Sequence, residues 1–323
     1  MKYNSFCVIG GAGFVASHLI DSLVEHGADK IVVVDNLFLG KMENLKEAYA
    51  KKPDIIFYKT DATFYHPLEK LIEAEHPEVV YNLAVKPLPC CFTDPEGTYR
   101  TSVDITTNLA ELLRLKKYKQ LIHFSSSECY GNAQKVPMDE KHPYNPTTPY
   151  GAGKLAADVL LQSYFNIFKI NMVIIRPFNM YGPRQNEGNY AGIIPLTIKR
   201  IMKGKPPMIN WDGEQTRDLT YVKDVVEGAI KLSECDKAKG KVVNLGQGNE
   251  TSINSLVATI CIIMGYPYEN TVRKPKRRGD VRRHLADIHQ AYKLIGYQPE
   301  TRLFNGLKKT VEWYNSSLVK KNI

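Results

Sequence analysis

Short β-branched runs alternate with longer amphipathic stretches from residue 6 to about residue 176. The runs are Phe6–Ile9, Ile31–Val34, Ile55–Tyr58, Val79–Leu83, Leu121–Ser125 and Met172–Ile175. Apolar runs of this length, separated by helix-length segments, are typical of buried strands joined by helical crossovers. Parallel strands need such crossovers, and the helices then cover both faces of the sheet. The alternation therefore predicts an α/β fold built on a doubly wound parallel sheet.

The composition of the sequence changes after Arg176: Gly, Pro and Asn become frequent, and the regular alternation of strand-like and helix-like segments stops. We therefore expect residues 1–176 to form the sheet domain and residues 177–323 to form mainly a smaller C-terminal α/β substrate domain. One further buried-strand run, Val242–Leu245, is expected to return to the first sheet. Residues 218–246 would then belong to the first domain as well.

A glycine-rich turn, Gly10-Gly11-Ala12-Gly13, connects the first strand to the first helix. Such a turn lets backbone N–H groups and a helix N-terminus meet a pyrophosphate. Asp35 ends the second strand 22 residues after Gly13, where a carboxylate can accept hydrogen bonds from both ribose hydroxyls and repels a 2′-phosphate. The combination predicts a Rossmann-type fold that binds NAD rather than NADP.

The other expected cofactor contacts follow the ends of neighbouring strands, where ligands of such sheets bind. Asp61 follows the third strand; it is a candidate for facing the adenine, and an exposed loop carboxylate is the alternative. The expected cofactor-binding residues are Gly10, Gly13, Phe14, Val15, Asp35, Asn36, Asp61, Ala62, Leu83, Ala84, Tyr150 and Lys154.

Tyr150 and Lys154 lie four residues apart, which on a helix places them on one face. A free tyrosine ionises near pH 10, and a neighbouring ammonium and a positive nicotinamide ring both favour the phenolate. A pKa lowered by about three units corresponds to roughly 4 kcal/mol. Ser126 directly follows the fifth strand, where its hydroxyl can orient a substrate alcohol. Taken alone, the Tyr150–Lys154 pair is typical of a surface helix, and Ser126 is typical of a turn. The order and spacing of the three residues together predict a catalytic set.

Seven motifs carry a family resemblance: I-G-G-A-G-F-V-A, V-D-N, F-S-S-S-E-C-Y-G, P-Y-G-A-G-K, R-P-F-N-M-Y-G-P-R-Q, D-G-E-Q-T-R-D and R-R-G-D. From about residue 6 to 300 the chain resembles the extended short-chain dehydrogenases/reductases called NAD-dependent epimerase/dehydratases. The resemblance implies an enzyme that oxidises a carbon, usually C4, of a nucleoside-diphosphate sugar. It implies that Tyr150 takes the hydroxyl proton with Lys154 beside it, that the hydride passes to NAD, and that Ser126 holds the hydroxyl.

The resemblance also implies substrate-binding residues in the second half of the chain. Asn179 is expected to contact the phosphate or sugar. Arg217 and Arg277 are expected to clamp the diphosphate through planar, bidentate donors; for Arg277, within the basic run Lys274–Arg278, a solvated surface is the alternative.

The loop from Asn82 to Cys91 departs from the family pattern. It brings Lys86 and two thiols, Cys90 and Cys91, toward the expected pocket, and Ser127 is expected there too. This departure leaves the nucleotide and the sugar open.

The reaction that follows C4 oxidation depends on the residue two positions after Ser126. Family dehydratases and decarboxylases often have Ser/Thr-x-Glu there, so Glu128 is a candidate base. We favour 4,6-dehydration, with 4-epimerisation as the alternative and a dehydrogenase that stops at the 4-ketone behind it. A decarboxylase would need a cation for the substrate carboxylate, for which Lys86 is the candidate. A catalytically silent NAD-binding protein is the alternative from another class.

Composition limits the remaining possibilities. The chain has 323 residues, a formal net charge of +9 and six cysteines. Its basic residues are dispersed and form no nucleic-acid motif, its cysteines and histidines lack metal-ligand spacing, and no run of about 18 apolar residues occurs. We expect a cytoplasmic protein without metal, membrane or nucleic-acid partner. By resemblance, helices around residues 95–116 and 150–167 are expected to pair two copies into a homodimer.

Overall fold

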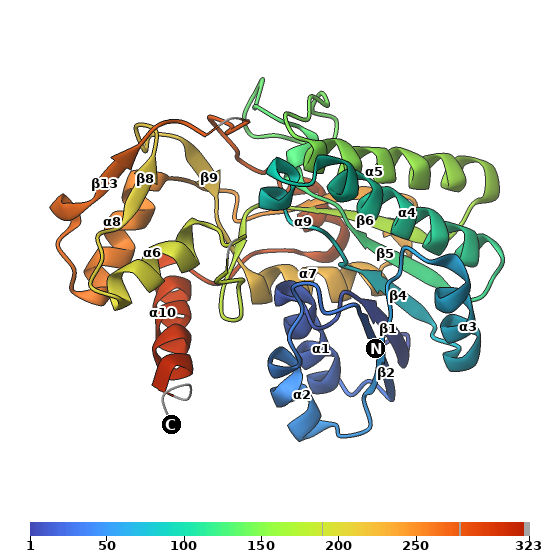
Figure 1. Ribbon diagram of the computed structural model, residues 1–323. Coiled ribbons are helices and arrows are strands. Elements are labelled where there is room, and N and C mark those ends of the chain that lie inside the picture. The colour runs from blue at the N-terminus through green and yellow to red at the C-terminus, as the bar shows by residue number, and fades with distance from the viewer. Residues whose placement is uncertain (189, 278, 320–323) are drawn as a thin grey trace.

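The structure is a computed structural model that describes residues 1–188, 190–277 and 279–319. Within these residues a seven-stranded sheet forms the centre of the molecule (Figure 1). From edge to edge its strands are β11 (Val242–Leu245), β6 (Met172–Pro177), β5 (Gln120–Phe124), β4 (Val79–Asn82), β1 (Ser5–Ile9), β2 (Lys30–Asp35) and β3 (Ile56–Lys59). All neighbouring pairs are parallel. The predicted parallel sheet is confirmed, and each strand lies within two residues of its expected bounds.

Helices cover both faces of this sheet. The helices of one face are α1 (Phe14–Glu25), α7 (Val222–Glu234) and α9 (His289–Ile295), and those of the other are α3 (Tyr65–Glu75), α4 (Pro95–Arg114) and α5 (Pro149–Phe168). Phe6 and Val8 of β1 pack toward the first group, and Cys7 and Ile9 toward the second. All four are buried because both faces are covered, which explains the continuous apolar run of this strand.

Helix α1 follows the sequence pattern closely. Leu19, Ile20 and Leu23 form its buried stripe. Gly27 then adopts a left-handed conformation with φ of +79°, and its N–H bonds to the Val24 carbonyl. This is the glycine stop that the sequence predicts.

A smaller part of the molecule lies beside one end of the sheet and has its own core (Figure 1). Its helices are α6 (Ile193–Met202), α8 (Ile253–Met264) and α10 (Leu303–Val319). Short strands pair beside them: β7 (Met180–Tyr181) with β10 (Thr220–Tyr221), β8 (Met208–Asn210) with β13 (Val272–Lys274), and β9 (Thr216–Asp218) with β12 (Glu250–Ser252). The remaining elements are helix α2 (Lys46–Lys51) and the 3-10 helices η1 (Met42–Leu45), η2 (Leu88–Phe92), η3 (Ser127–Cys129), η4 (Asp236–Ala238) and η5 (Tyr268–Asn270).

The chain returns to the main sheet after β10. Helix α7 packs on the α1 face, and β11 pairs with β6 in parallel register, Val242 opposite Ile174. The expected return of Val242–Leu245 is therefore confirmed. None of the helices in the described part of the chain has the length and apolarity needed to span a membrane.

Candidate active site

The strand order reverses between β1 and β4, and a large cavity of about 1430 Å³ opens at the carboxyl ends of these strands. In doubly wound sheets ligands bind at this reversal. The cavity is lined from both parts of the molecule. On one side are the loops that follow β1, β2, β3, β4 and β5, and on the other are residues 177–180, 184–187, 190 and 192. One enclosure can thus hold a dinucleotide and a second ligand.

The glycine turn forms the floor of this cavity. Gly10 has φ of +75°, and a Cβ there would lie 2.7 Å from the Cα of Ala84 at the end of β4. At Gly11 a Cβ would lie 2.6 Å from the Val33 side chain, so this glycine serves packing. The Gly13 N–H donates to the Gly10 carbonyl at 3.0 Å, and α1 begins at the next residue. The turn therefore brings bare backbone and a helix N-terminus to the cavity, as a pyrophosphate requires.

Asp35 is held rigidly at the cavity wall. Its Oδ2 accepts a hydrogen bond from the Ala12 N–H at 3.0 Å, and its Oδ1 accepts one from the Leu37 N–H at 2.7 Å. Burial raises the pKa of this carboxyl, and the two backbone hydrogen bonds oppose the rise. Each oxygen keeps a second lone pair, so the carboxylate can still accept hydrogen bonds from a ribose diol.

Two loops are tied together beside Asp35. The Asn36 amide donates to Asp61 Oδ2 at 2.9 Å, so these side chains from the ends of β2 and β3 form one edge of the cavity. The structure brings nearly the whole expected cofactor set to the cavity wall. The members that line it are Gly10, Gly13, Phe14, Val15, Asp35, Asn36, Asp61, Ala62, Leu83, Ala84 and Tyr150.

Tyr150, Ser126 and Lys154 meet where α5 passes the end of β5. The Tyr150 and Ser126 hydroxyls share a hydrogen bond, and both residues line the cavity. Lys154 lies behind them and is 3% exposed; its ammonium donates to the Phe124 carbonyl at 2.7 Å. Thr148 caps the helix by accepting from the Gly151 N–H, and this fixes the start of α5 under Tyr150.

Burial affects the charge of both Tyr150 and Lys154. Burial raises the pKa of Tyr150 above its ordinary value, and the hydrogen bond with Ser126 opposes the rise. Burial also lowers the pKa of Lys154 to about 8, and its ammonium donates to the Phe124 carbonyl. That Lys154 and a bound nicotinamide ring together favour the Tyr150 phenolate stays a prediction. The dry surroundings that bring the two groups together disfavour charge on both.

Glu128 lies in η3, one turn past Ser126, and lines the same cavity. Burial raises the pKa of its carboxyl, while Arg217 acts to lower it. Within the described residues its carboxylate accepts no hydrogen bond, although its own N–H donates to Ser126 Oγ at 3.2 Å. A carboxyl without a fixed partner and with a raised pKa is suited to take up and release a proton.

Asn179 and Ser127 also line the cavity, as expected for substrate-binding residues. The Asn179 Nδ2 atom is buried and has no hydrogen-bond partner among the residues that the structure describes. A buried amide donor without a partner is costly, so a ligand oxygen in the cavity would satisfy it.

The two expected diphosphate arginines share one carboxylate outside the cavity wall. Arg217 donates to Asp280 Oδ1 at 2.5 Å and to the Val281 carbonyl at 2.9 Å. Arg277 is half exposed and lies 3.9 Å from the same oxygen. The structure therefore brings the arginines together, but Arg217 is engaged by protein acceptors. Asp280 belongs to the R-R-G-D motif, yet the motif alone assigned it no role; Arg278 of that motif lies outside the described residues.

Lys86 lies at the rim of the cavity. Its ammonium bonds to Asp94 Oδ2 at 2.8 Å and stands over the Phe38 ring at 5.8 Å. Cys90 and Cys91 are buried in η2 behind this rim and do not form part of the wall. The loop that departs from the family pattern therefore shapes the entrance more than the reacting centre.

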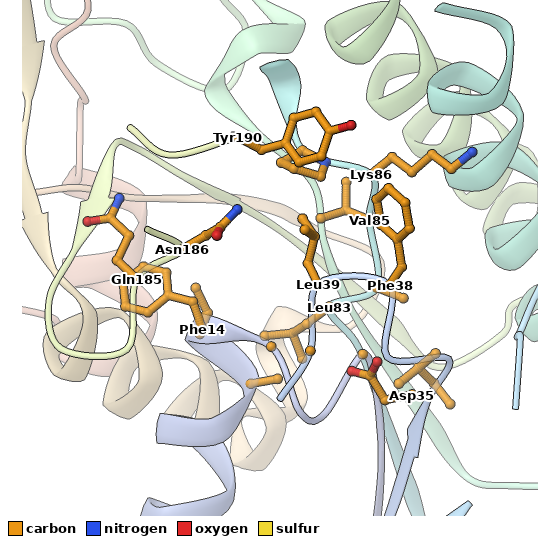
Figure 2. A pocket seen from close by; sticks show the side chains of 18 of the residues that line it. Phe14, Asp35, Phe38, Leu39, Leu83, Val85, Lys86, Gln185, Asn186 and Tyr190 are labelled. Carbon is orange, nitrogen blue, oxygen red and sulfur yellow. The ribbon is translucent and has the colours of Figure 1, made fainter. Parts of the chain in front are cut away.

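Several cavity residues escaped the sequence analysis because they come from a distant loop. Figure 2 shows Gln185, Asn186 and Tyr190 across the cavity from Asp35. The Tyr190 and Phe38 rings lie 6.2 Å apart and join the two sides of the entrance. The only local signal for this loop was its richness in Gly and Asn, which indicates a loop and says nothing of what it contacts.

The glycine turn, the carboxylate after β2 and the Ser-Tyr pair backed by a lysine define the class of short-chain dehydrogenases/reductases. Residues 7–310 match the family described as GDP-mannose 4,6-dehydratase. The chain therefore belongs to this family, within the extended short-chain dehydrogenases/reductases, which confirms the resemblance seen in the sequence. It is an enzyme of the nucleotide-sugar epimerase/dehydratase group.

Individual relatives cover almost the whole chain. A UDP-glucose 4-epimerase from Mycolicibacterium smegmatis is 34% identical over 311 residues, covering 96% of this chain and 98% of that protein. The structure of a UDP-glucose 4-epimerase with UDP-glucose from Thermotoga maritima is similar with a TM-score of 0.91 at 32% identity, over 97% and 99% of the two chains. A UDP-glucuronic acid 4-epimerase mutant from Bacillus cereus, solved with a fluorinated substrate analogue and NAD, has a TM-score of 0.89 at 29% identity over the same shares.

Relatives with other activities stand at similar identities. A dTDP-D-glucose 4,6-dehydratase from Homo sapiens is 30% identical and a UDP-glucuronic acid decarboxylase from Arabidopsis thaliana is 31% identical. Overall sequence identity therefore does not distinguish epimerisation, dehydration and decarboxylation. The side chains that line the cavity are the better guide to the reaction.

Proposed function

We propose that this enzyme oxidises C4 of a nucleoside-diphosphate sugar with NAD and then dehydrates the sugar across C5 and C6. The observation that carries the second step is Glu128, which lines the cavity with Ser126 and Tyr150. The pKa of its carboxyl is raised, and no described residue donates a hydrogen bond to it. An epimerase that only returns hydride to C4 needs no such group. A dehydratase needs a base for the C5 proton.

NAD fits the residues that line the cavity. The glycine turn brings the N-terminus of α1, at Phe14 and Val15, to the cavity where a pyrophosphate can bind, and Asp35 offers its free lone pairs to a ribose. When bound, NAD supplies a hydride acceptor and donor. The Bacillus cereus relative solved with NAD supports the same assignment.

The protein side chains handle the protons of this reaction. Tyr150 takes the C4 hydroxyl proton as the C4 hydride leaves, and Ser126 holds that oxygen. The C4 ketone acidifies the C5 proton, which Glu128 removes. The C6 hydroxyl then departs with a proton from Glu128 as water. With NAD bound, hydride would return to C6, while C5 would take up the solvent-exchangeable proton that Tyr150 received from the C4 hydroxyl. The product is a 4-keto-6-deoxy sugar, and the cofactor ends in its starting oxidation state.

A 4-epimerase is the second candidate, and the named relatives favour it. Both the Mycolicibacterium smegmatis relative and the Thermotoga maritima structure carry that name. In this alternative the 4-keto sugar turns within the cavity and hydride returns to the opposite face of C4. Glu128 would then only shape the wall.

Proton NMR in deuterated water separates the two reactions. The protein is mixed with NAD and, in turn, GDP-mannose, UDP-glucose, dTDP-glucose and UDP-glucuronic acid. Dehydration incorporates deuterium at C5 and creates a C6 methyl group, while epimerisation inverts C4 without solvent deuterium. We expect Tyr150→Phe to lower either rate by about 10²–10⁴-fold, the usual contribution of a general base.

Glu128→Gln tests the assigned base directly. We expect dehydration to fall by about 10²–10⁴-fold while C4 oxidation continues, so that reduced cofactor accumulates and absorbs in the near ultraviolet. Glu140→Gln is the matched control, because Glu140 is a partly buried carboxyl that bonds to the Asn244 N–H away from the cavity. Dehydration at the unmodified rate in Glu128→Gln would remove Glu128 from the mechanism. If every sugar returned unchanged in both the unmodified protein and Tyr150→Phe, the enzymatic proposal would fail.

We also propose that two copies pair through α4 and α5. Val159 and Ile167 lie two helical turns apart on the outer face of α5, and they are 52% and 72% exposed. Tyr99 of the adjoining α4 is 40% exposed. An apolar stripe on two packed helices is suited to bury itself against a second copy.

A further inference from the structure

Helix α5 carries a third buried residue on the face that holds Tyr150 and Lys154. Asp158 follows Lys154 by four residues, as Lys154 follows Tyr150, so the three side chains form one stripe. Tyr150 lines the cavity, whereas Lys154 and Asp158 do not. Asp158 is fully buried. It can therefore influence the reaction only through neighbouring groups, and Lys154 on the same helix face is one of them.

Arg176 of β6 holds Asp158 in place. Its Nε donates to Asp158 Oδ2 at 2.9 Å, and its Nη2 lies 2.8 Å from the same oxygen. Its guanidinium carbon stands 4.9 Å from the Tyr130 ring centroid and 4.8 Å from that of Tyr144, and both phenol oxygens accept hydrogen bonds from it. Burying an ion pair removes two charges from water, which stability alone does not require.

The second oxygen of Asp158 is unpaired. Within residues 1–188, 190–277 and 279–319, Oδ1 accepts no hydrogen bond; it lies 3.8 Å from His123 Nε2 of β5, which has no hydrogen-bond partner there either. Cys129 of η3 approaches Oδ2 at 3.8 Å. Arg176 thus fixes the Asp158 carboxylate through Oδ2. The charge on Oδ1 is not taken up by a hydrogen bond from the described residues and can act on neighbouring groups.

The charges around Lys154 are few. Burial lowers the pKa of His123 and raises that of Cys129 to about 12, so both are neutral near pH 7. On the cavity side, burial raises the pKa of Tyr150 and Glu128. Burial also raises the pKa of Asp158, while the charge of Arg176 and its hydrogen bond act to lower it. Among these described groups, the carboxyl that an ion pair favours in its charged form is that of Asp158, one helical turn after Lys154. Its charge acts on Lys154 against the effect of burial.

We propose that Asp158, held by Arg176, is a positioning residue that keeps Lys154 charged beneath Tyr150. The inference rests on the proposed role of Tyr150 as the base. Without Asp158, the guanidinium of Arg176, which does not deprotonate, would be an uncompensated buried cation. Lys154 would then lose its proton more easily and stabilise the Tyr150 phenolate less.

The first test is the pH dependence of kcat/KM in Asp158→Asn. Activity should rise with pH as Tyr150 becomes a phenolate. We call this rising part of the pH profile the acid limb. In Asp158→Asn the acid limb should lie about one pH unit higher, so that kcat/KM at a given pH on the limb is about tenfold lower. Titration of the tyrosinate absorbance of the NAD-loaded protein should show the same shift without turnover. Tyr150→Phe identifies which part of the signal belongs to Tyr150.

A second variant separates positioning from stability, because a single substitution leaves Arg176 unpaired. Asp158→Asn/Arg176→Met removes both charges and should restore thermal stability. The acid limb of this double variant should still lie at higher pH than that of the unmodified protein. In Asp158→Glu, which keeps a carboxylate, the acid limb should lie close to that of the unmodified protein. Asp224→Asn is the control: Asp224 of α7 bonds to Thr301 away from the cavity, so its loss should lower Tm without moving the limb.

Two results would overturn the proposal. One is a stable double variant with the original acid limb and tyrosinate titration. The other is measured on the unmodified protein: nitrogen NMR of Lys154 Nζ, assigned with Lys154→Arg, that shows a neutral amine at pH 7. Failure of the proposed function is distinct, because it would appear as full activity in Tyr150→Phe.

Discussion

The Asp35 carboxylate meets the cavity with both oxygens already bonded to backbone N–H groups of Ala12 and Leu37. Replacing it with Asn removes the charge and one acceptor while keeping the size. Because hydrogen bonds to a charged group contribute about 1.5–3 kcal/mol, we expect NAD to bind roughly 10- to 100-fold more weakly in Asp35→Asn. The affinity for NADP should fall less, because the substitution removes the repulsion between the Asp35 carboxylate and the 2′-phosphate. Calorimetric titration with both dinucleotides measures the ratio.

Asp54→Asn is the matched control for this substitution. Asp54 is an exposed carboxylate that precedes β3, and its partner is Lys52 at the surface. The control should leave both affinities unchanged. An unaltered preference for NAD in Asp35→Asn would show that another group selects the dinucleotide.

Single residues differ in how far the sequence could place them. Ser126 and Tyr150 were found because their chain order and spacing are local. The partnership of Arg217 with Asp280 joins residues 63 positions apart, so no local pattern reveals it. Burial was equally hidden: it raises the pKa of Tyr150, and this effect depends on residues packed around the phenol from elsewhere in the chain.

At the scale of elements, the turn between β1 and α1 allows a matched test. Gly10 and Gly27 both have a positive φ, of +75° and +79°. A Cβ at Gly10 would lie 2.7 Å from the Ala84 Cα, whereas at Gly27 it would meet nothing within 4 Å. Both alanine variants carry the left-handed strain of about 1–2 kcal/mol. Only Gly10→Ala adds a backbone clash.

We therefore expect Gly10→Ala to lower Tm more than Gly27→Ala and to weaken NAD binding at least about tenfold, because β4 and the turn must separate where the pyrophosphate binds. Thermal unfolding and NAD titration of both variants check this. Equal losses of Tm with NAD binding intact in both would mean that the turn tolerates a side chain.

The elements of the main sheet were predictable because burial on both faces makes each strand a continuous apolar run. The small part of the molecule gave no such signal. Strands such as β7 and β10 contain two residues each, and their pairing depends on contacts between positions 180 and 220. The limits of the two expected domains stay a prediction.

At the scale of the whole molecule, one loop connects the two parts around the cavity. Arg184 forms ion pairs with Asp21 of α1 at 2.5 Å and with Glu47 of α2 at 2.8 Å. Tyr190 of the same loop lies against Phe38. The cofactor side and the substrate side are thus fixed to each other by the segment that also lines the cavity, so binding on one side can order the other.

The outer faces of α4 and α5 lead to the last prediction, which concerns assembly. In size-exclusion chromatography with light scattering, the unmodified protein should have twice the mass of one chain. Val159→Glu/Ile167→Glu should yield the single-chain mass, because two carboxylates would be buried at the interface without partners. Ile262→Glu on α8 is the control: Ile262 is 73% exposed on a different helix, so the dimer should persist. A monomeric unmodified protein at working concentration would contradict the dimer, and dissociation in both variants would show that the effect is general rather than specific to α5.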